Sequence, residues 1–131
     1  MTVDEFLTWE SQQTGRFEFL AGQRVPVKPS TQARSLLITD IVSLLKPALR
    51  GTSMRVLTNF RVRCGDDVRY PAVIVDAGQY IPTAREPSQP FAIIDVDRER
   101  DWSAIPSIRY LPMSVGDDPH RVLTLLQMRT K

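Results

Sequence analysis

Two short apolar segments constrain the fold most. The stretch "VRYPAVIV" (residues 68–75) and the stretch "FAIIDV" (residues 91–96) are rich in β-branched side chains and are flanked by turn-forming residues. Runs of this length and composition are typical of buried strands. Asp76 directly follows the first run, and Asp95 lies within the second. The chain is therefore expected to form a sheet whose central strands are buried.

The cover for this sheet is predicted from residues 30–49. Leu37, Ile41 and Leu45 recur at helical spacing and mark the centre of a wide apolar stripe. The pair "PS" precedes the stripe and Gly51 follows it, as expected for the two ends of a helix. We expect this long helix to pack against one face of the sheet.

The remaining elements are shorter. A capping box formed by Thr2 and Glu5 predicts a first helix. The other predicted elements are strands: a hairpin over residues 16–27, strands over 54–64 and 68–75 joined by the turn "GDD", and strands over 91–96, 108–115 and 121–129. This order indicates a single α+β domain over residues 1–131, with a mixed, largely antiparallel twisted sheet and one long covering helix.

Composition narrows the class of protein. A net charge of +2 and a pI near 9.0 permit contact with nucleic acid without arguing for it. Cys64 is the only cysteine and His120 the only histidine, which excludes an intrachain disulfide and metal clusters rich in cysteine or histidine. Cys64 has no histidine neighbour in the sequence to activate it, and His120 is expected in an exposed turn. With no signal-peptide pattern and no long apolar run, a soluble cytoplasmic protein without a membrane span is expected.

Several segments occur in the order of a known family. The N-terminal "MTVDEFLTWESQQTGRFEFLAGQRV", the "PS" before the long helix, "VRYPAVIV", "FAIIDV" and "IPSIRYLPMSV" together resemble the Uma-two family of restriction-endonuclease-like proteins. This is a bacterial group with a nuclease-like core of the PD-(D/E)XK type. The resemblance covers most of the chain and depends on order and spacing rather than on one motif. It implies a restriction-endonuclease-like fold and metal-dependent cleavage of DNA.

The resemblance also implies site positions, which this sequence fills unevenly. The glutamate of the early strand is retained as Glu18, and the glutamate of the later strand is shortened to Asp95. The place of the histidine near the start of the long helix falls at about Ala33. Ala72 stands where the family has the aspartate that is its main metal ligand.

A helix carrying a lysine follows the later strand in the family. Here "DRERDWSA" leads almost directly to "IPSIRY", so this second core helix is expected to be deleted near residues 97–105. Phosphodiester cleavage needs a divalent cation, and Mg²⁺ prefers carboxylate and other oxygen ligands. Alanine offers no ligand at the central position. The sequence therefore predicts a nuclease-like fold that lacks the central metal ligand of its site. No cofactor is expected, or Mg²⁺ or Mn²⁺ if the protein is active.

Each candidate residue also has an ordinary structural interpretation. Glu18 is either a site residue or a charge-paired surface residue. Asp97 is expected to face the same way as Asp95, and either joins it in a residual metal site or pairs with Arg98 or Arg100 at the end of a strand. Arg55, Arg61, Arg63 and Arg69 form either a phosphate-binding stripe or the exposed face of a sheet.

Three functions remain open from the sequence. The first is a catalytically degenerate protein that binds itself or another macromolecule, the second an active DNA endonuclease that uses Glu18 and Asp95, and the third a DNA-binding module that does not cleave. Trp102, in the shortened connection, either plugs the space of the lost helix or belongs to a partner surface. We predict a homodimer formed over the open region between Val96 and Ile105, with Trp102 buried at a two-fold contact.

Overall fold

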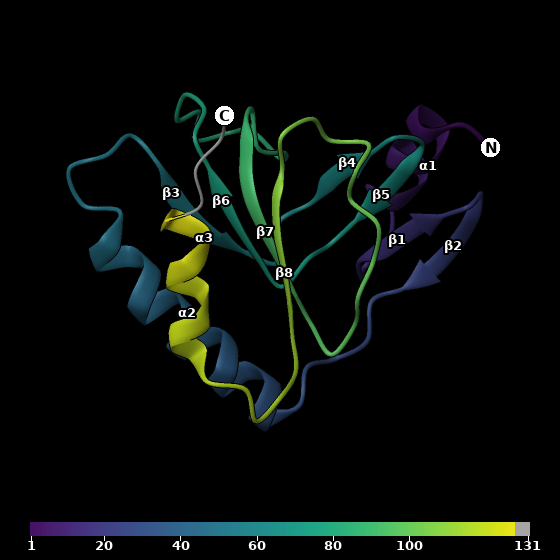
Figure 1. Cartoon of the computed structure of the whole chain (residues 1–131). Coiled ribbons are helices and arrows are strands. Elements are labelled where there is room, and N and C mark those ends of the chain that lie inside the picture. The colour runs from purple at the N-terminus through teal and green to yellow at the C-terminus, as the bar shows by residue number, and fades with distance from the viewer. Residues whose placement is uncertain (128–131) are drawn as a thin grey trace.

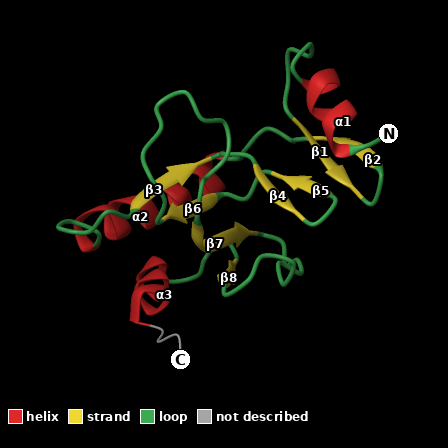
Figure 2. Ribbon diagram, turned by 90° about the horizontal axis from the view of Figure 1, so that it is seen from above, coloured by secondary structure: helices red, strands yellow, loops and turns green. Residues whose placement is uncertain are grey.

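The strands form two sheets rather than the one sheet predicted from the sequence (Figures 1 and 2). The computed structural model describes residues 1–127. Its strands are β1 (Phe17–Leu20), β2 (Gln23–Pro26), β3 (Arg55–Thr58), β4 (Val62–Cys64), β5 (Asp67–Arg69), β6 (Val73–Asp76), β7 (Pro90–Val96) and β8 (Arg109–Met113). The first sheet has the order β2-β1-β5-β4, and the second has the order β3-β6-β7-β8.

The pairing within the sheets is mixed, as predicted. All neighbours in the first sheet are antiparallel. In the second sheet β3, β6 and β7 are antiparallel, whereas β8 pairs parallel to β7. The α+β class and the strand at residues 91–96 are therefore confirmed.

Two predicted strands each divide in two, and this division creates the second sheet. Residues 54–64 are interrupted at Asn59, which has a φ of 53° and so cannot continue an extended strand. Residues 68–75 are interrupted around Pro71, which has no backbone N–H to donate to a neighbouring strand. The inner pair of strands, β4 and β5, turns into the first sheet, while the outer pair, β3 and β6, stays in the second.

The long helix α2 (Gln32–Ala48) covers one face of the second sheet, as predicted (Figure 1). Its buried Ile41 and Leu45 pack in one cluster with Val73 and Ile94 of the central strands. The first helix, α1 (Val3–Glu10), has the predicted capping box. It covers the first sheet through Phe6, whose ring stacks on that of Phe19 at 4.9 Å.

The prediction of a last strand over residues 121–129 is wrong. Its described part forms a 3₁₀ helix (Pro119–Val122) followed by helix α3 (Leu123–Gln127), while residues 128 and 129 lie outside the described range. Asp118 caps this helical segment by accepting a hydrogen bond from the His120 N–H, and Pro119 suits a first helical turn. Val122 and Leu125, three residues apart, are both buried in the cluster under α2.

No helix among residues 1–127 is both long enough and apolar enough to cross a membrane.

Candidate functional site

The two predicted carboxylates, Glu18 and Asp95, are brought together, although they lie in different sheets. Both are buried, with 3% and 1% of the residue surface exposed. The guanidinium of Arg100 lies between them. It donates to Glu18 Oε2 at 2.9 Å, to Asp95 Oδ1 at 2.7 Å and to Asp95 Oδ2 at 3.2 Å. One arginine thus neutralises charge on both candidate ligands.

Asp95 has two further donors. The Trp102 indole N–H and the Tyr110 hydroxyl both donate to Oδ2, each at 2.9 Å. Burial opposes the ionisation of Asp95, but the hydrogen bonds and charge of Arg100, aided by Trp102 and Tyr110, outweigh it and lower the pKa of the carboxyl group. Burial also raises the pKa of Tyr110 to about 12, so this phenol remains a proton donor at neutral pH.

Both carboxylate oxygens of Glu18 also accept hydrogen bonds. Its Oε1 accepts from Arg98 at 3.1 Å, and its Oε2 accepts from the Tyr70 backbone N–H at 2.7 Å as well as from Arg100. The interpretation of Glu18 as a surface residue is therefore wrong, although its charge pairing is confirmed. Each face of β1 is covered in this protein. Phe19 packs under α1, while the arginines after β7 reach Glu18.

Ala72 lies at the level of Asp95 and supplies no ligand. The last register pair between β6 and β7 joins Val73 to Ile94, so Ala72 and Asp95 are the next residues on each side. Ala72 is buried in the cluster under α2. Ala33, at the expected histidine position, is exposed in the first turn of α2.

The carboxylate oxygens of Glu18 and Asp95 are not arranged to bind a divalent cation. Every oxygen of Glu18 and Asp95 accepts at least one hydrogen bond, and a guanidinium already occupies the space that links them. Among residues 1–127 no group of three or more His, Cys, Asp or Glu side chains is arranged to hold a metal ion. Mg²⁺ would require free oxygens in near-octahedral geometry.

The connection between β7 and β8, residues 97–108, contains no helix. In its place Trp102 covers the face of the second sheet opposite α2. Its side chain is buried with Ile74 and Ile93, and the guanidinium carbons of Arg69 and Arg100 lie 4.7 and 5.1 Å from the ring centroid. Trp102 is thus buried against the core of the single chain, and its burial leaves little of it for a two-fold contact.

Asp97 does not join the site, which corrects the expectation that it faces the same way as Asp95. It has a φ of 60° and ends the strand, so the alternation of side chains stops there. Its carboxylate accepts from the Val115 N–H at 2.9 Å, not from Arg98 or Arg100.

The four arginines of the predicted stripe each have a carboxylate partner. Arg55 belongs to the second sheet and pairs with Asp76 at 3.5 Å, while Arg69 pairs with its neighbour Asp67 at 2.8 Å. The remaining pairs are Arg61 with Glu10 and Glu86, and Arg63 with Glu86 and Asp4.

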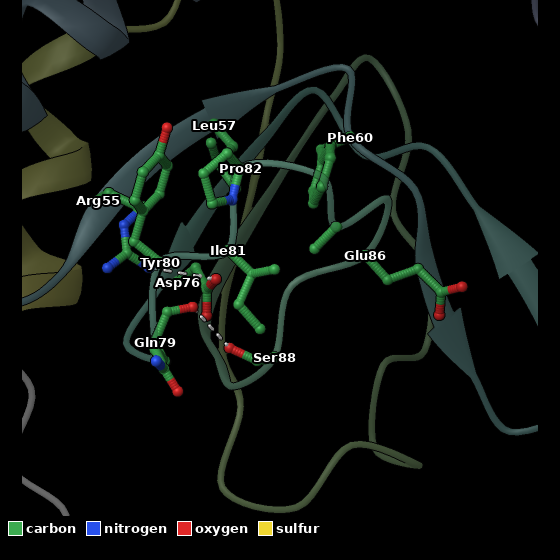
Figure 3. A pocket seen from close by; sticks show the side chains of 11 residues that line it. Arg55, Leu57, Phe60, Asp76, Gln79, Tyr80, Ile81, Pro82, Glu86 and Ser88 are labelled. Carbon is green, nitrogen blue, oxygen red and sulfur yellow. Dashed lines mark hydrogen bonds and ion pairs between the residues drawn. The ribbon is translucent and has the colours of Figure 1, made fainter.

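Asp76 lies in a separate pocket at the far end of β6 (Figure 3). Its Oδ1 accepts from the N–H groups of Gly78 and Gln89, which closes the loop between β6 and β7.

Cys64 is buried, and this burial raises the pKa of its thiol, which disfavours a nucleophilic role. His120 is exposed beside Asp118.

One further buried carboxylate, that of Glu10, was not predicted from the sequence. Glu10 accepts from the Tyr70 hydroxyl at 2.9 Å, from the Phe17 N–H at 2.8 Å and from Arg61 at 3.3 Å. Burial, together with this hydrogen bond to Glu10, raises the pKa of Tyr70 to about 12. Tyr70 therefore connects α1 to Glu18, since its backbone N–H donates to Glu18 and its hydroxyl donates to Glu10. Glu10 is the last residue of α1, an amphipathic helix. No local sequence pattern indicates that its carboxylate is buried.

The architecture is an α+β fold that has a counterpart among solved structures. A solved structure described as "a putative nuclease belonging to DUF820 from Anabaena variabilis" matches with a TM-score of 0.60 and 20% sequence identity. The match covers 73% of this chain and 57% of that chain, so this chain spans little more than half the length of its structural neighbour. DUF820 is the Uma-two family, and at this identity it is the fold that is shared. No family model and no curated protein matches the sequence.

Proposed function

We propose that this chain is a catalytically silent nuclease-like domain that acts by binding another macromolecule. The observation that supports the proposal best is Arg100, whose guanidinium bridges Glu18 and Asp95 at 2.9 and 2.7 Å. Ala72, at the position where the resemblance places an aspartate, offers no third oxygen ligand. The short connection after β7 contributes Arg98, Arg100 and Trp102, and we infer that it replaces the lysine-bearing helix of the family.

Charge neutralisation by an arginine does not supply the chemistry of a metal ion. A divalent cation polarises the phosphate and lowers the pKa of a bound water, which produces the hydroxide for attack. A guanidinium only donates hydrogen bonds and holds no water in a coordination sphere. An active endonuclease with Mg²⁺ or Mn²⁺ on Glu18 and Asp95 would first have to displace Arg100 from two buried carboxylates.

We expect no cleavage of plasmid or single-stranded DNA by the purified protein with Mg²⁺ or Mn²⁺. The matched variants are Asp95→Asn and Glu18→Gln, with folding checked by circular dichroism. Cleavage by the native chain that both variants abolish would contradict the proposal, because a contaminating nuclease would survive these substitutions. Calorimetric titration with Mn²⁺ gives a readout that does not depend on activity, and we expect no stoichiometric binding.

A homodimer remains a prediction, but its contact surface needs revision. Because Trp102 is only 2% exposed in the single chain, a two-fold contact would have to use other side chains. Leu36 on α2 is exposed at 59% and belongs to no core cluster of the described residues. We expect Leu36→Glu to shift a dimer measured by light scattering toward monomer, while Leu44→Met, a conservative change on the same helix, leaves it intact. A dimer that survives Leu36→Glu would place the contact elsewhere.

A further inference from the structure

A groove lies between the β1–β2 hairpin, the start of α2 and the segment that follows β7. It has a volume of about 500 Å³. Four cationic side chains line it, Arg16, Lys28, Arg34 and Arg98, against one carboxylate, that of Asp97. In Figure 1 the dark-blue link from β2 to α2 and the green segment after β7 run along this part of the molecule.

Three of these cations have no carboxylate partner among residues 1–127. None of the ion pairs formed among the described residues includes Arg16, Lys28 or Arg34. By contrast, the four arginines of the predicted stripe in the sheets each pair with a carboxylate. Asp97, the one acidic side chain in the lining, has one carboxylate oxygen engaged by the Val115 N–H.

The guanidinium groups of the groove retain unused donors. Arg16 donates to the Asn59 carbonyl at 3.3 Å, and Arg34 donates to Ser30 Oγ at 3.2 Å. Each guanidinium has five N–H donors, so donors remain for a ligand beyond the one hydrogen bond that each of them makes here. Burial, the largest cause, together with the nearby charges of Arg98 and Arg16, lowers the pKa of Arg34, although Asp97 opposes this. A bound anion would relieve the repulsion among these side chains.

A second depression continues the groove along α2. It has a volume of about 410 Å³ and shares Ser30, Arg34 and Asn59 with the first. Its lining adds the hydroxyl-bearing residues Ser35, Thr39, Ser43 and Thr58. Guanidinium, hydroxyl and amide groups are the side chains that contact phosphate and sugar in nucleic-acid complexes.

We infer that this groove binds the phosphate of a nucleotide or nucleic acid directly through Arg16, Lys28 and Arg34, without a divalent cation. The inference rests on the proposed function, because it identifies the ligand class of a domain that binds and does not cleave. Arg98 lines the groove and also pairs with Glu18, so it links the groove to the candidate site.

Fluorescence anisotropy with a labelled single-stranded oligonucleotide, in EDTA at low salt, tests the inference. The variant is Lys28→Gln with Arg34→Gln, and its matched control is Lys46→Gln with Arg50→Gln. The control pair has the same chemistry and net charge change, is exposed, and lies at the other end of α2, outside the groove. Circular dichroism checks that both fold.

We expect the groove variant to weaken binding by roughly tenfold for each cation removed, since hydrogen bonds to charged groups are stronger than those between neutral groups. The slope of log affinity against log salt should fall by roughly 1 for each cation. The control pair should bind like the native chain. Competition with adenosine monophosphate and inorganic phosphate distinguishes a mononucleotide from a polynucleotide ligand, and success with either supports the inference.

Three results would overturn it: no binding of any probe at low salt, equal loss in both double variants, or binding that requires Mg²⁺. These results are distinct from failure of the proposed function. Cleavage of the oligonucleotide with Mg²⁺ would refute catalytic silence and leave phosphate binding in EDTA standing. Absence of both cleavage and binding would refute only the groove.

Discussion

Replacing Arg100 with methionine is expected to lower the free energy of unfolding by about 3–5 kcal/mol, because it leaves two buried carboxylates without their shared cation. Methionine keeps much of the aliphatic length, so the loss reports the charge and hydrogen bonds rather than packing. Arg98→Met is the control. Arg98 is 41% exposed at its side chain and pairs only with Glu18, so its loss should cost less than about 1 kcal/mol. Urea denaturation measures both values.

The pH dependence of stability should reverse in sign in the Arg100→Met variant. In the native chain the pKa of Asp95 is lowered, so its contribution to stability is present above the unfolded pKa of about 4 and is lost as the pH falls through the folded value. Without Arg100, burial dominates and raises this pKa. The variant should then lose stability as the pH rises above about 4. Equal cost for Arg98→Met and Arg100→Met, or unchanged pH dependence, would contradict the role assigned to Arg100.

Trp102→Ala should cost about 3–5 kcal/mol, the usual range for truncating a buried large aromatic side chain. The substitution opens a cavity against Ile74 and Ile93 and removes one of the donors to Asp95. Trp102→Phe separates these effects in part, since it keeps one aromatic ring in the buried space while losing the N–H and part of the indole volume. We expect it to cost about 1–3 kcal/mol, the penalty for leaving a buried acceptor short of a donor.

Tyr80→Ala provides the comparison for Trp102→Ala. Tyr80 is 66% exposed on the loop between β6 and β7, so its removal should change stability by no more than about 0.5 kcal/mol. A small cost for Trp102→Ala, similar to that of Tyr80→Ala, would mean that the connection after β7 does not cover the sheet.

Sequence patterns predicted the elements whose apolar spacing has one interpretation. The stripe through Ile41 and Leu45 could only be a helix, and residues 91–96 could only be a buried strand. The C-terminal segment failed because Val122 and Leu125 fit a short strand as well as a helix, and its capping by Asp118 decided between them. The division into two sheets depended on the single backbone conformation of Asn59 and on the break at Pro71.

The site was predicted in part. The resemblance gave Glu18 and Asp95, and the structure brings them together. The alternative interpretation of Glu18 as a surface residue assumed that β1 has one solvent face, whereas both of its central residues are buried. Arg100 could not be found from the sequence, because it lies in an irregular charged segment where no periodicity relates it to Asp95. A pair of arginines shortly after a buried carboxylate, close to a tryptophan, was the only available signal.

The bridge made by Arg100 also limits how this protein can evolve. Losing Arg100 first leaves the buried Asp95 without a cation and Glu18 with only the partly exposed Arg98, with the large cost given above. Gaining an aspartate at Ala72 first would place a third carboxylate in a core position that is 1% exposed. Each single step toward a metal-binding centre is destabilising, and the combined change would gather three buried carboxylates whose charge only a bound cation could compensate. Selection acting on one substitution at a time would therefore oppose each of these changes.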